Sequence, residues 1–86
     1  MSYRVILTRQ AIKDIAKLKK INLCEKAKIM LKNMETDPYF QPYKKLSGDL
    51  RNKFSRRLNI KHRIVYEVDE EIKIIKILSM WSHYEF

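Results

Sequence analysis

The chain has 86 residues, with 19 Lys and Arg against 10 Asp and Glu, which gives a net charge of +9. A chain this short holds one hydrophobic core, so we expect a single domain over residues 1–86. The positive excess favours an anionic partner, but no apolar run approaches the ~18 residues of a membrane span, and no signal peptide is expected. The lone Cys24 excludes an internal disulfide and favours the reducing cytoplasm.

The positive charge is concentrated in the second half of the chain. Residues 44–66 carry eight basic side chains and one acidic side chain, Asp49, whereas residues 67–86 carry a net charge of −3. A solvated face usually mixes both signs. The segment 44–66 therefore favours a surface that binds a polyanion.

The first 37 residues predict a strand followed by two helices. Residues 3–7 are mostly apolar and include the β-branched Val5 and Ile6, which is typical of a short strand. Thr8 is a suitable N-cap for a helix with apolar residues at helical spacing, namely Ala11, Ile12, Ile15 and Ala16. Asn22 and Glu25 resemble a capping box for a second helix, and Pro38 is expected to end that helix.

The rest of the chain predicts a loop over residues 39–51 and three strands over residues 54–60, 62–69 and 72–80. Phe54, Leu58 and Ile60 are expected on the buried face of the first of these strands. The element order β-α-α-β-β-β predicts an α+β domain, an antiparallel sheet with an N-terminal helical hairpin packed on one face. The opposite face, which bears Arg57, is then free for a ligand.

Several motifs of the second half resemble the Txe/YoeB toxins of the RelE superfamily. They are Tyr43-Lys44-Lys45-Leu46-Ser47-Gly48, Ser55-Arg56-Arg57, His62-Arg63-Ile64-Val65-Tyr66 and the terminal His83-Tyr84. The resemblance implies a RelE-like fold and a ribosome-dependent endoribonuclease that cuts mRNA in the ribosomal A site, with no metal or cofactor. It also implies a cognate antitoxin of the YefM/Axe type, through which the toxin would reach operator DNA.

The chemistry of metal-free RNA cleavage suits the residues that the resemblance singles out as catalytic. The substrate 2′-OH attacks the neighbouring phosphorus, so a base, an acid and cations for the developing charge are needed. Histidine has an ordinary pKa of ~6.5 and is a natural acid, which favours His83. Arg57 and Arg63 are expected to clamp phosphate, and Tyr84 to stack on a base or bind a phosphate oxygen.

Further basic and aromatic residues are expected to contact RNA or the ribosome: Lys45, Arg51, Lys53, Arg56 and Trp81. Arg56 has the opposite strand parity from Arg57, which also predicts that its side chain extends over the core or pairs with an acidic group. His62 is expected at the core or at a sheet edge, Cys24 as an inert buried thiol, and the tyrosines other than Tyr84 as packing residues. The two histidines and one cysteine lack the spacing of a metal site.

Lys44 is a departure from the family pattern. Family members commonly carry Glu here, and that carboxylate is thought to be the general base. Lysine is ordinarily protonated at neutral pH, so Lys44 acts either as a base in a strongly cationic setting or only through its charge. The departure leaves one alternative to the enzyme, a catalytically silent RNA- or ribosome-binding module that has lost its base with Lys44. A third hypothesis is a DNA-binding regulator, for which no helix-turn-helix is visible.

Overall fold

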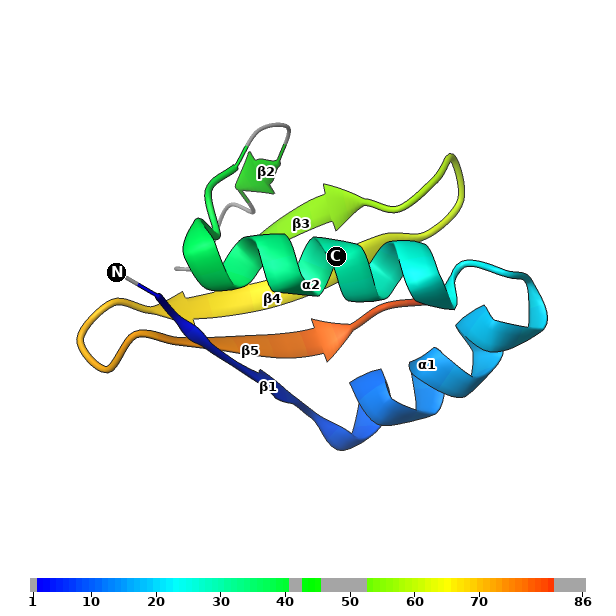
Figure 1. Cartoon of the computed structure of the whole chain (residues 1–86), viewed down its shortest axis with the longest axis horizontal. Coiled ribbons are helices and arrows are strands. Elements are labelled where there is room, and N and C mark those ends of the chain that lie inside the picture. Colours follow the sequence, from blue (N-terminus) through cyan, green and yellow to red (C-terminus); the bar gives the residue numbers. More distant parts are fainter. Residues whose placement is uncertain (1, 41–42, 46–52, 82–86) are drawn as a thin grey trace.

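A five-stranded sheet with two helices on one side forms the fold of the computed structural model, which describes residues 2–40, 43–45 and 53–81 (Figure 1). The elements in chain order are β1 (Arg4–Leu7), α1 (Arg9–Lys20), α2 (Cys24–Thr36), β2 (Lys44–Lys45), β3 (Lys53–Arg57), β4 (Arg63–Asp69) and β5 (Ile74–Ser79). The α+β class predicted from the sequence is confirmed. The segment predicted as a loop contains the short strand β2.

Thr8 caps α1, as predicted. Its Oγ1 accepts a hydrogen bond from the N–H of Ala11 at 3.2 Å and donates one to the carbonyl of Ile77 at 2.8 Å. The same side chain therefore gives a hydrogen-bond acceptor to a free N–H in the first turn of α1 and also attaches the helix to β5. Leu18 on the inner side of α1 is completely buried.

The start of α2 differs from the prediction. The capping box of Asn22 and Glu25 is wrong, because the helix spans Cys24–Thr36 and no side chain caps its start. Asn22 instead lies in the turn between the helices with a φ of 61°, a left-handed conformation that Asn tolerates better than most residues. The helix does end before Pro38, where Asp37 is extended, as predicted.

The strand order in the sheet is β1-β5-β4-β3-β2. The neighbours from β2 to β5 pair antiparallel, but β1 runs parallel to β5, with Arg4 opposite Ile74 and Leu7 opposite Ile77. The prediction of a wholly antiparallel sheet is therefore wrong at this edge. A helical hairpin follows β1 instead of a tight turn, so nothing local sets its direction.

The core lies between the helices and one face of the sheet. It contains apolar side chains from both helices and from β3, β4 and β5, including Ala11, Leu18, Ala27, Met34, Phe54, Ile64, Tyr66, Ile75 and Ile77. Ile60, expected on the buried face, is 87% exposed. The reason is that β3 ends at Arg57, and a tight turn follows in which the N–H of Leu58 binds the carbonyl of His62 at 2.8 Å.

The other side of the sheet carries no helix of the described chain, and we call it the helix-free face. Strand alternation and pairing place on it the side chains of Lys44, Lys53, Ser55, Arg57, Arg63, Glu67 and Lys76. This face is the one that the sequence predicted to be available for a ligand.

Candidate functional site

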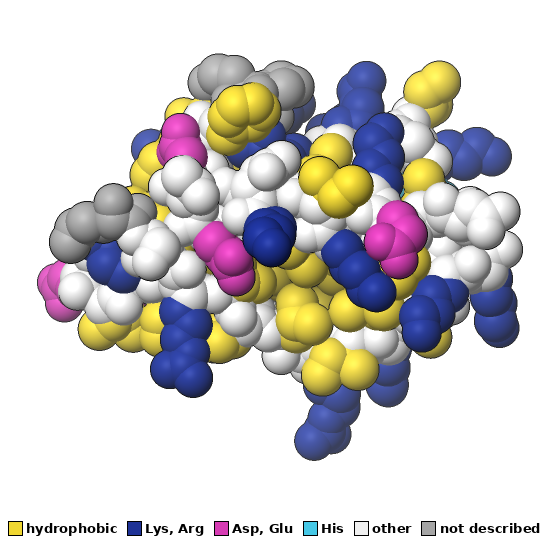
Figure 2. Space-filling model, viewed as in Figure 1, with side chains coloured by type: hydrophobic (Ala, Val, Ile, Leu, Met, Phe, Trp, Pro, Cys, Tyr) yellow, Lys and Arg dark blue, Asp and Glu magenta, His cyan; other side chains and the backbone are white. Residues whose placement is uncertain are grey.

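Basic side chains are not confined to one face of the molecule. Figure 2 shows Lys and Arg spread over the helix side, among apolar side chains that are also exposed. Net charge by itself therefore does not locate a site. The location depends on which cations the fold brings together.

Two arginines meet directly across the helix-free face. Arg57 of β3 is paired with Arg63 of β4, and Lys44 of β2 is paired with Ser55, which precedes Arg57 by two positions. Like charges directly opposite each other on a sheet are destabilising. The fold therefore holds cations together at a cost in stability, as expected for a site that binds a strong anion.

A cavity of about 280 Å³ lies at this pair. Its lining consists of Tyr43, Lys44, Ser55, Arg57 and Arg63. Guanidinium groups bind phosphate oxygens in a bidentate manner, and an ammonium group adds a point charge. The arrangement is therefore suited to hold a phosphate group and to stabilise additional negative charge on it.

The structure brings together three of the five residues predicted to be catalytic: Lys44, Arg57 and Arg63. The other two, His83 and Tyr84, lie outside the described residues, as does Arg51. Their predicted roles stay predictions.

The remaining predicted RNA contacts are distributed over the molecule. Lys53 lies on the helix-free face, where its Nζ forms an ion pair with Glu67 at 3.0 Å, so its charge is partly compensated. Lys45 is exposed but is paired with Phe54, which places it on the helix side of the sheet. Neither residue lines the cavity with Arg57 and Arg63.

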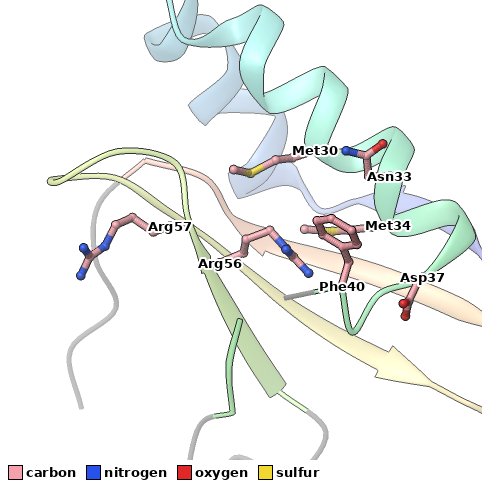
Figure 3. Close-up of a pocket in the computed structure, with 7 residues that line it drawn as sticks. All are labelled: Met30, Asn33, Met34, Asp37, Phe40, Arg56 and Arg57. Atoms are coloured by element: carbon pink, nitrogen blue, oxygen red, sulfur yellow. The ribbon is translucent and has the colours of Figure 1, made fainter. Parts of the chain in front are cut away.

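Arg56 lies on the opposite side of the sheet from the cavity lined by Arg57 and Arg63. It is only 5% exposed, and its guanidinium carbon lies 5.7 Å from the centre of the Phe40 ring. Figure 3 shows Arg56 directed toward Phe40 and Met34, whereas Arg57 extends away from them. The position of Arg56 therefore does not support its predicted contact with RNA. It agrees with the prediction from strand parity, namely that the side chain extends over the core.

Figure 3 also shows the second cavity, of about 170 Å³, to which Arg56 belongs. Its lining combines the apolar side chains of Met30, Met34 and Phe40 with the polar side chains of Asn33, Asp37, Arg56 and Arg57. Nearby, burial raises the pKa of the Tyr66 hydroxyl, and the positive charge of Arg56 opposes that rise. This cavity lies between α2 and β3, and Arg57 lines both it and the cationic cavity.

Trp81 and His62 pack against each other at the end of β5. Their ring centres are 4.4 Å apart, and the Nζ of Lys17 lies 5.6 Å from the Trp81 ring. His62 is half-buried in the turn between β3 and β4, in agreement with its prediction as an edge histidine. Trp81 is half-buried as well, so it is anchored by packing rather than presented freely to RNA.

The sequence alone does not single out Tyr43 and Ser55 as site residues. Ser55 alternates with Arg57 along β3, and this period of two is the signal that places both on one face. Tyr43 is expected to pack, and its ring does contact Phe54, with centres 5.7 Å apart. Its exposed edge nevertheless lines the cationic cavity.

Two features were searched for in the described ranges, a metal-type side-chain cluster and a helix that could span a membrane. Within residues 2–40, 43–45 and 53–81, no three His, Cys, Asp or Glu side chains come together as a metal site. Neither helix in this part of the chain is long and apolar enough to cross a membrane. Cys24 is buried, as predicted.

Several solved structures that share this fold are of proteins named YoeB or RelE. The YoeB dimer of Staphylococcus aureus is 28% identical with a TM-score of 0.79, and the match covers 98% of this chain and 100% of that one. For the archaeal RelE–RelB complex of Pyrococcus horikoshii OT3 the identity is 26%, the TM-score 0.80 and the coverage 95% and 96%. The YoeB/ParE toxin of Agrobacterium tumefaciens shares the fold at 22% identity, with a TM-score of 0.83 and coverage of 94% and 99%.

The family follows from the sequence match. Residues 7–84 match the model of the YoeB-like toxins of bacterial type II toxin–antitoxin systems. The match covers nearly the whole chain, and the protein belongs to this family. Comparison with curated protein sequences found no significant match.

Proposed function

We propose that this toxin is an mRNA interferase, a ribosome-dependent endoribonuclease that cuts mRNA in the ribosomal A site. The observation that carries the proposal is the pairing of Arg57 with Arg63 beside Lys44 around one cavity. The three cations are held together at a cost in stability, and the chain belongs to a toxin family. Such a site is suited to stabilise a phosphodiester in its transition state.

The proposed reaction uses no metal or cofactor. The 2′-oxygen attacks the adjacent phosphorus as its proton passes to solvent water, and the bond from phosphorus to the 5′-oxygen breaks. His83 donates a proton to that leaving oxygen. The products are a 2′,3′-cyclic phosphate and a 5′-hydroxyl end, while Arg57 and Arg63 stabilise the charge on the phosphorane.

We assign Lys44 an electrostatic role. It is exposed and lines the same cavity as Arg57 and Arg63, so a 2′-hydroxyl placed there meets three positive charges and ionises more easily. Lys44→Arg should then keep substantial cleavage, because arginine preserves the charge but is not a base. Lys44→Met should slow single-turnover cleavage by about 10²-fold. A Lys44→Arg variant as slow as Lys44→Met would instead identify Lys44 as the base.

A second candidate function is a silent ribosome-binding relative. The observation in its favour is the same Lys44, which stands where the family commonly has a glutamate. Such a protein would keep the cationic cavity and bind ribosomes without cutting mRNA.

The proposed partner is a cognate acidic antitoxin of the YefM/Axe type. Among the structural relatives, YoeB of Staphylococcus aureus has been solved with YefM, and RelE of Pyrococcus horikoshii OT3 with RelB. We expect the antitoxin to present acidic groups to the helix-free face and to carry the pair to operator DNA. Expression of the toxin alone should arrest bacterial growth, and a neighbouring antitoxin gene should relieve the arrest.

The deciding experiment is cleavage of mRNA on programmed ribosomes by the purified chain. The wild type should produce cuts in the A-site codon. His83→Gln should keep the fold and ribosome binding but lose about 10²–10⁴-fold in rate. Cys24→Ala, which changes a buried thiol that does not line the cavity, is the matched control and should cut at the wild-type rate. A wild type that binds ribosomes without cutting at any pH supports the silent relative.

A further inference from the structure

The strand β2, which carries Lys44, is too short to hold its own position. It consists of Lys44 and Lys45 at the edge of the sheet, beside β3 (Figure 1), and both side chains are exposed. Fixing the backbone of a residue costs about as much free energy as a backbone hydrogen bond returns, and two exposed lysines bury little apolar surface that could add to it. A residue outside β2 must therefore supply the stability that keeps Lys44 opposite Ser55.

Tyr43, the residue directly before β2, makes contacts that can supply this stability. Its ring centre lies 5.7 Å from that of Phe54, with an angle of 72° between the planes, and 6.0 Å from that of Tyr39. Tyr39 and Phe54 also meet edge to face at 5.5 Å, and Phe54 stacks on the buried Tyr66 at 5.6 Å. We call Tyr39, Tyr43, Phe54 and Tyr66 the aromatic cluster. Ring pairs at these distances attract each other beyond the effect of the apolar area that they bury, so the aromatic cluster attaches Tyr43 to the core.

The aromatic cluster is itself fixed by hydrogen bonds to other parts of the fold. The hydroxyl of Tyr39 donates to the carboxylate of Glu70, in the turn between β4 and β5. The hydroxyl of Tyr66, in β4, donates to the carbonyl of Pro38 at 2.7 Å. These two bonds hold Pro38 and Tyr39 against β4 and the turn that follows it. Tyr39 therefore offers a fixed surface against which the Tyr43 ring packs.

The alternation of side chains converts a fixed Tyr43 into a fixed direction for Lys44. Successive side chains of an extended chain point to opposite faces of a sheet. The Tyr43 ring contacts Phe54 of the core, so Lys44 is directed to the helix-free face, where it lines the cavity with Arg57 and Arg63. A slip of β2 by one residue would move Lys44 to the other face. The ring contacts of Tyr43 oppose such a slip.

We propose that Tyr39 and Tyr43 are positioning residues for Lys44, an inference that rests on the proposed function. Lysine carries a compact charge on a flexible stem, so its backbone must be fixed if the charge is to act at one place. A displacement of about 1 Å can slow a reaction ~10²-fold. Tyr39 does not line the cavity, so it acts on Lys44 through the ring of Tyr43.

The test uses variants that separate the aromatic ring from the hydroxyl group. Tyr43→Phe and Tyr39→Phe keep the rings, whereas Tyr43→Leu and Tyr39→Leu remove them. Because Tyr39 does not line the cavity, slower cleavage by Tyr39→Leu does not reflect a lost contact with RNA in the cavity. Tyr3→Leu is the matched control, because the hydroxyl of Tyr3 also donates to Glu70, at 3.0 Å, but Tyr3 is outside the aromatic cluster.

Tyr43→Leu and Tyr39→Leu should each slow single-turnover cleavage by roughly 10–100-fold per folded molecule, whereas both Phe variants should keep most of the rate. Tyr43→Leu combined with Lys44→Met should be less than about twofold slower than Lys44→Met alone, since a positioning residue has no effect once the positioned group is gone. Tyr3→Leu should lower Tm and cut at the wild-type rate. The proposal is overturned if either Leu variant cuts at the wild-type rate per folded molecule, or if the effects of Tyr43→Leu and Lys44→Met multiply in full.

NOE measurements between β2 and β3 give a readout that does not depend on cleavage. Opposite residues of an antiparallel pair have Cα atoms about 4.5–5.5 Å apart, so the wild type should show an NOE between backbone protons of Lys44 and Ser55. The NOE should persist in Tyr43→Phe and disappear in Tyr43→Leu. A wild type without this NOE, or a Tyr43→Leu variant that keeps it, overturns the positioning role. Absence of wild-type cleavage, with the expected NOE pattern, overturns the proposed function and leaves the positioning of Lys44 supported.

Discussion

The cross-strand pair of Arg57 and Arg63 allows a test in which stability and activity should change in opposite directions. Replacing Arg57 with Gln keeps part of the aliphatic stem and a hydrogen-bonding end, but removes one of two like charges that face each other. The variant should therefore be more stable than the wild type. It should also be a poorer enzyme, because the transition state loses a cation.

The size of each effect follows from the geometry. Cross-strand pairs on a sheet contribute roughly 0.2–1 kcal/mol, and a like-charged pair opposes folding by a similar amount. For a domain of this size, relief of that repulsion raises Tm by about 1–8 °C. The gain should shrink at high salt, since the screening length falls from about 30 Å at 0.01 M to about 3 Å at 1 M. Single-turnover cleavage should slow by about 10²-fold or more.

The measurements are thermal unfolding at low and high salt and single-turnover cleavage on ribosomes. Lys76→Gln is the matched control, because Lys76 is on the same face but lies opposite Glu67, a residue of opposite charge. That variant should not raise Tm and should cut normally. If Arg57→Gln instead lowers Tm by several degrees while the rate per folded molecule is unchanged, Arg57 is a structural residue and the assignment of the site is refuted.

Three further predictions concern binding and the scaffold. Ribosome binding should weaken steeply as salt rises, because contacts between lysine or arginine and phosphate release counterions, and an affinity insensitive to salt would contradict a phosphate-binding face. Leu18→Ala should lower the free energy of unfolding by about 2–5 kcal/mol, measured by urea titration, since Leu18 is completely buried; a loss under about 1 kcal/mol would contradict the packing. The pKa of the Glu70 carboxyl is lowered from 4.5 to about 2 by hydrogen bonds, first from Lys73 and then from Tyr39. The stability that these hydrogen bonds give to the folded protein is therefore complete above pH 4.5 and is lost as pH falls toward 2. Glu70→Gln should therefore lower Tm at pH 7, and the difference from the wild type should disappear near pH 2; a difference independent of pH would contradict this linkage.

Much of the architecture follows from local sequence signals. Thr8 starts α1 and Pro38 ends α2, because capping and the restriction before proline act within a few residues. The acidic turn between β4 and β5 joins neighbouring strands, so their antiparallel pairing is predictable from a short connection. Strand parity also separates Arg57 from Arg56, and this separation predicts which arginine faces the ligand.

Other features depend on contacts between distant parts of the chain. The partner and direction of β1 are set by β5, about 70 residues away, because a strand followed by a helical hairpin has no local signal for its orientation. The positive φ of Asn22 and the exposure of Ile60 result from where the helices and strands end in the packed domain.

The site itself divides in the same way. The residue types and the alternation of Ser55 and Arg57 are local, and they predict a cationic face from the sequence alone. Only the packed sheet decides that Arg57 lies opposite Arg63 and that Lys44 joins them, because pairing across strands depends on register. The contact of Asp14 with Met80 is likewise invisible in the sequence, since nothing near either residue indicates that a helix carboxylate and a strand N–H will be buried together.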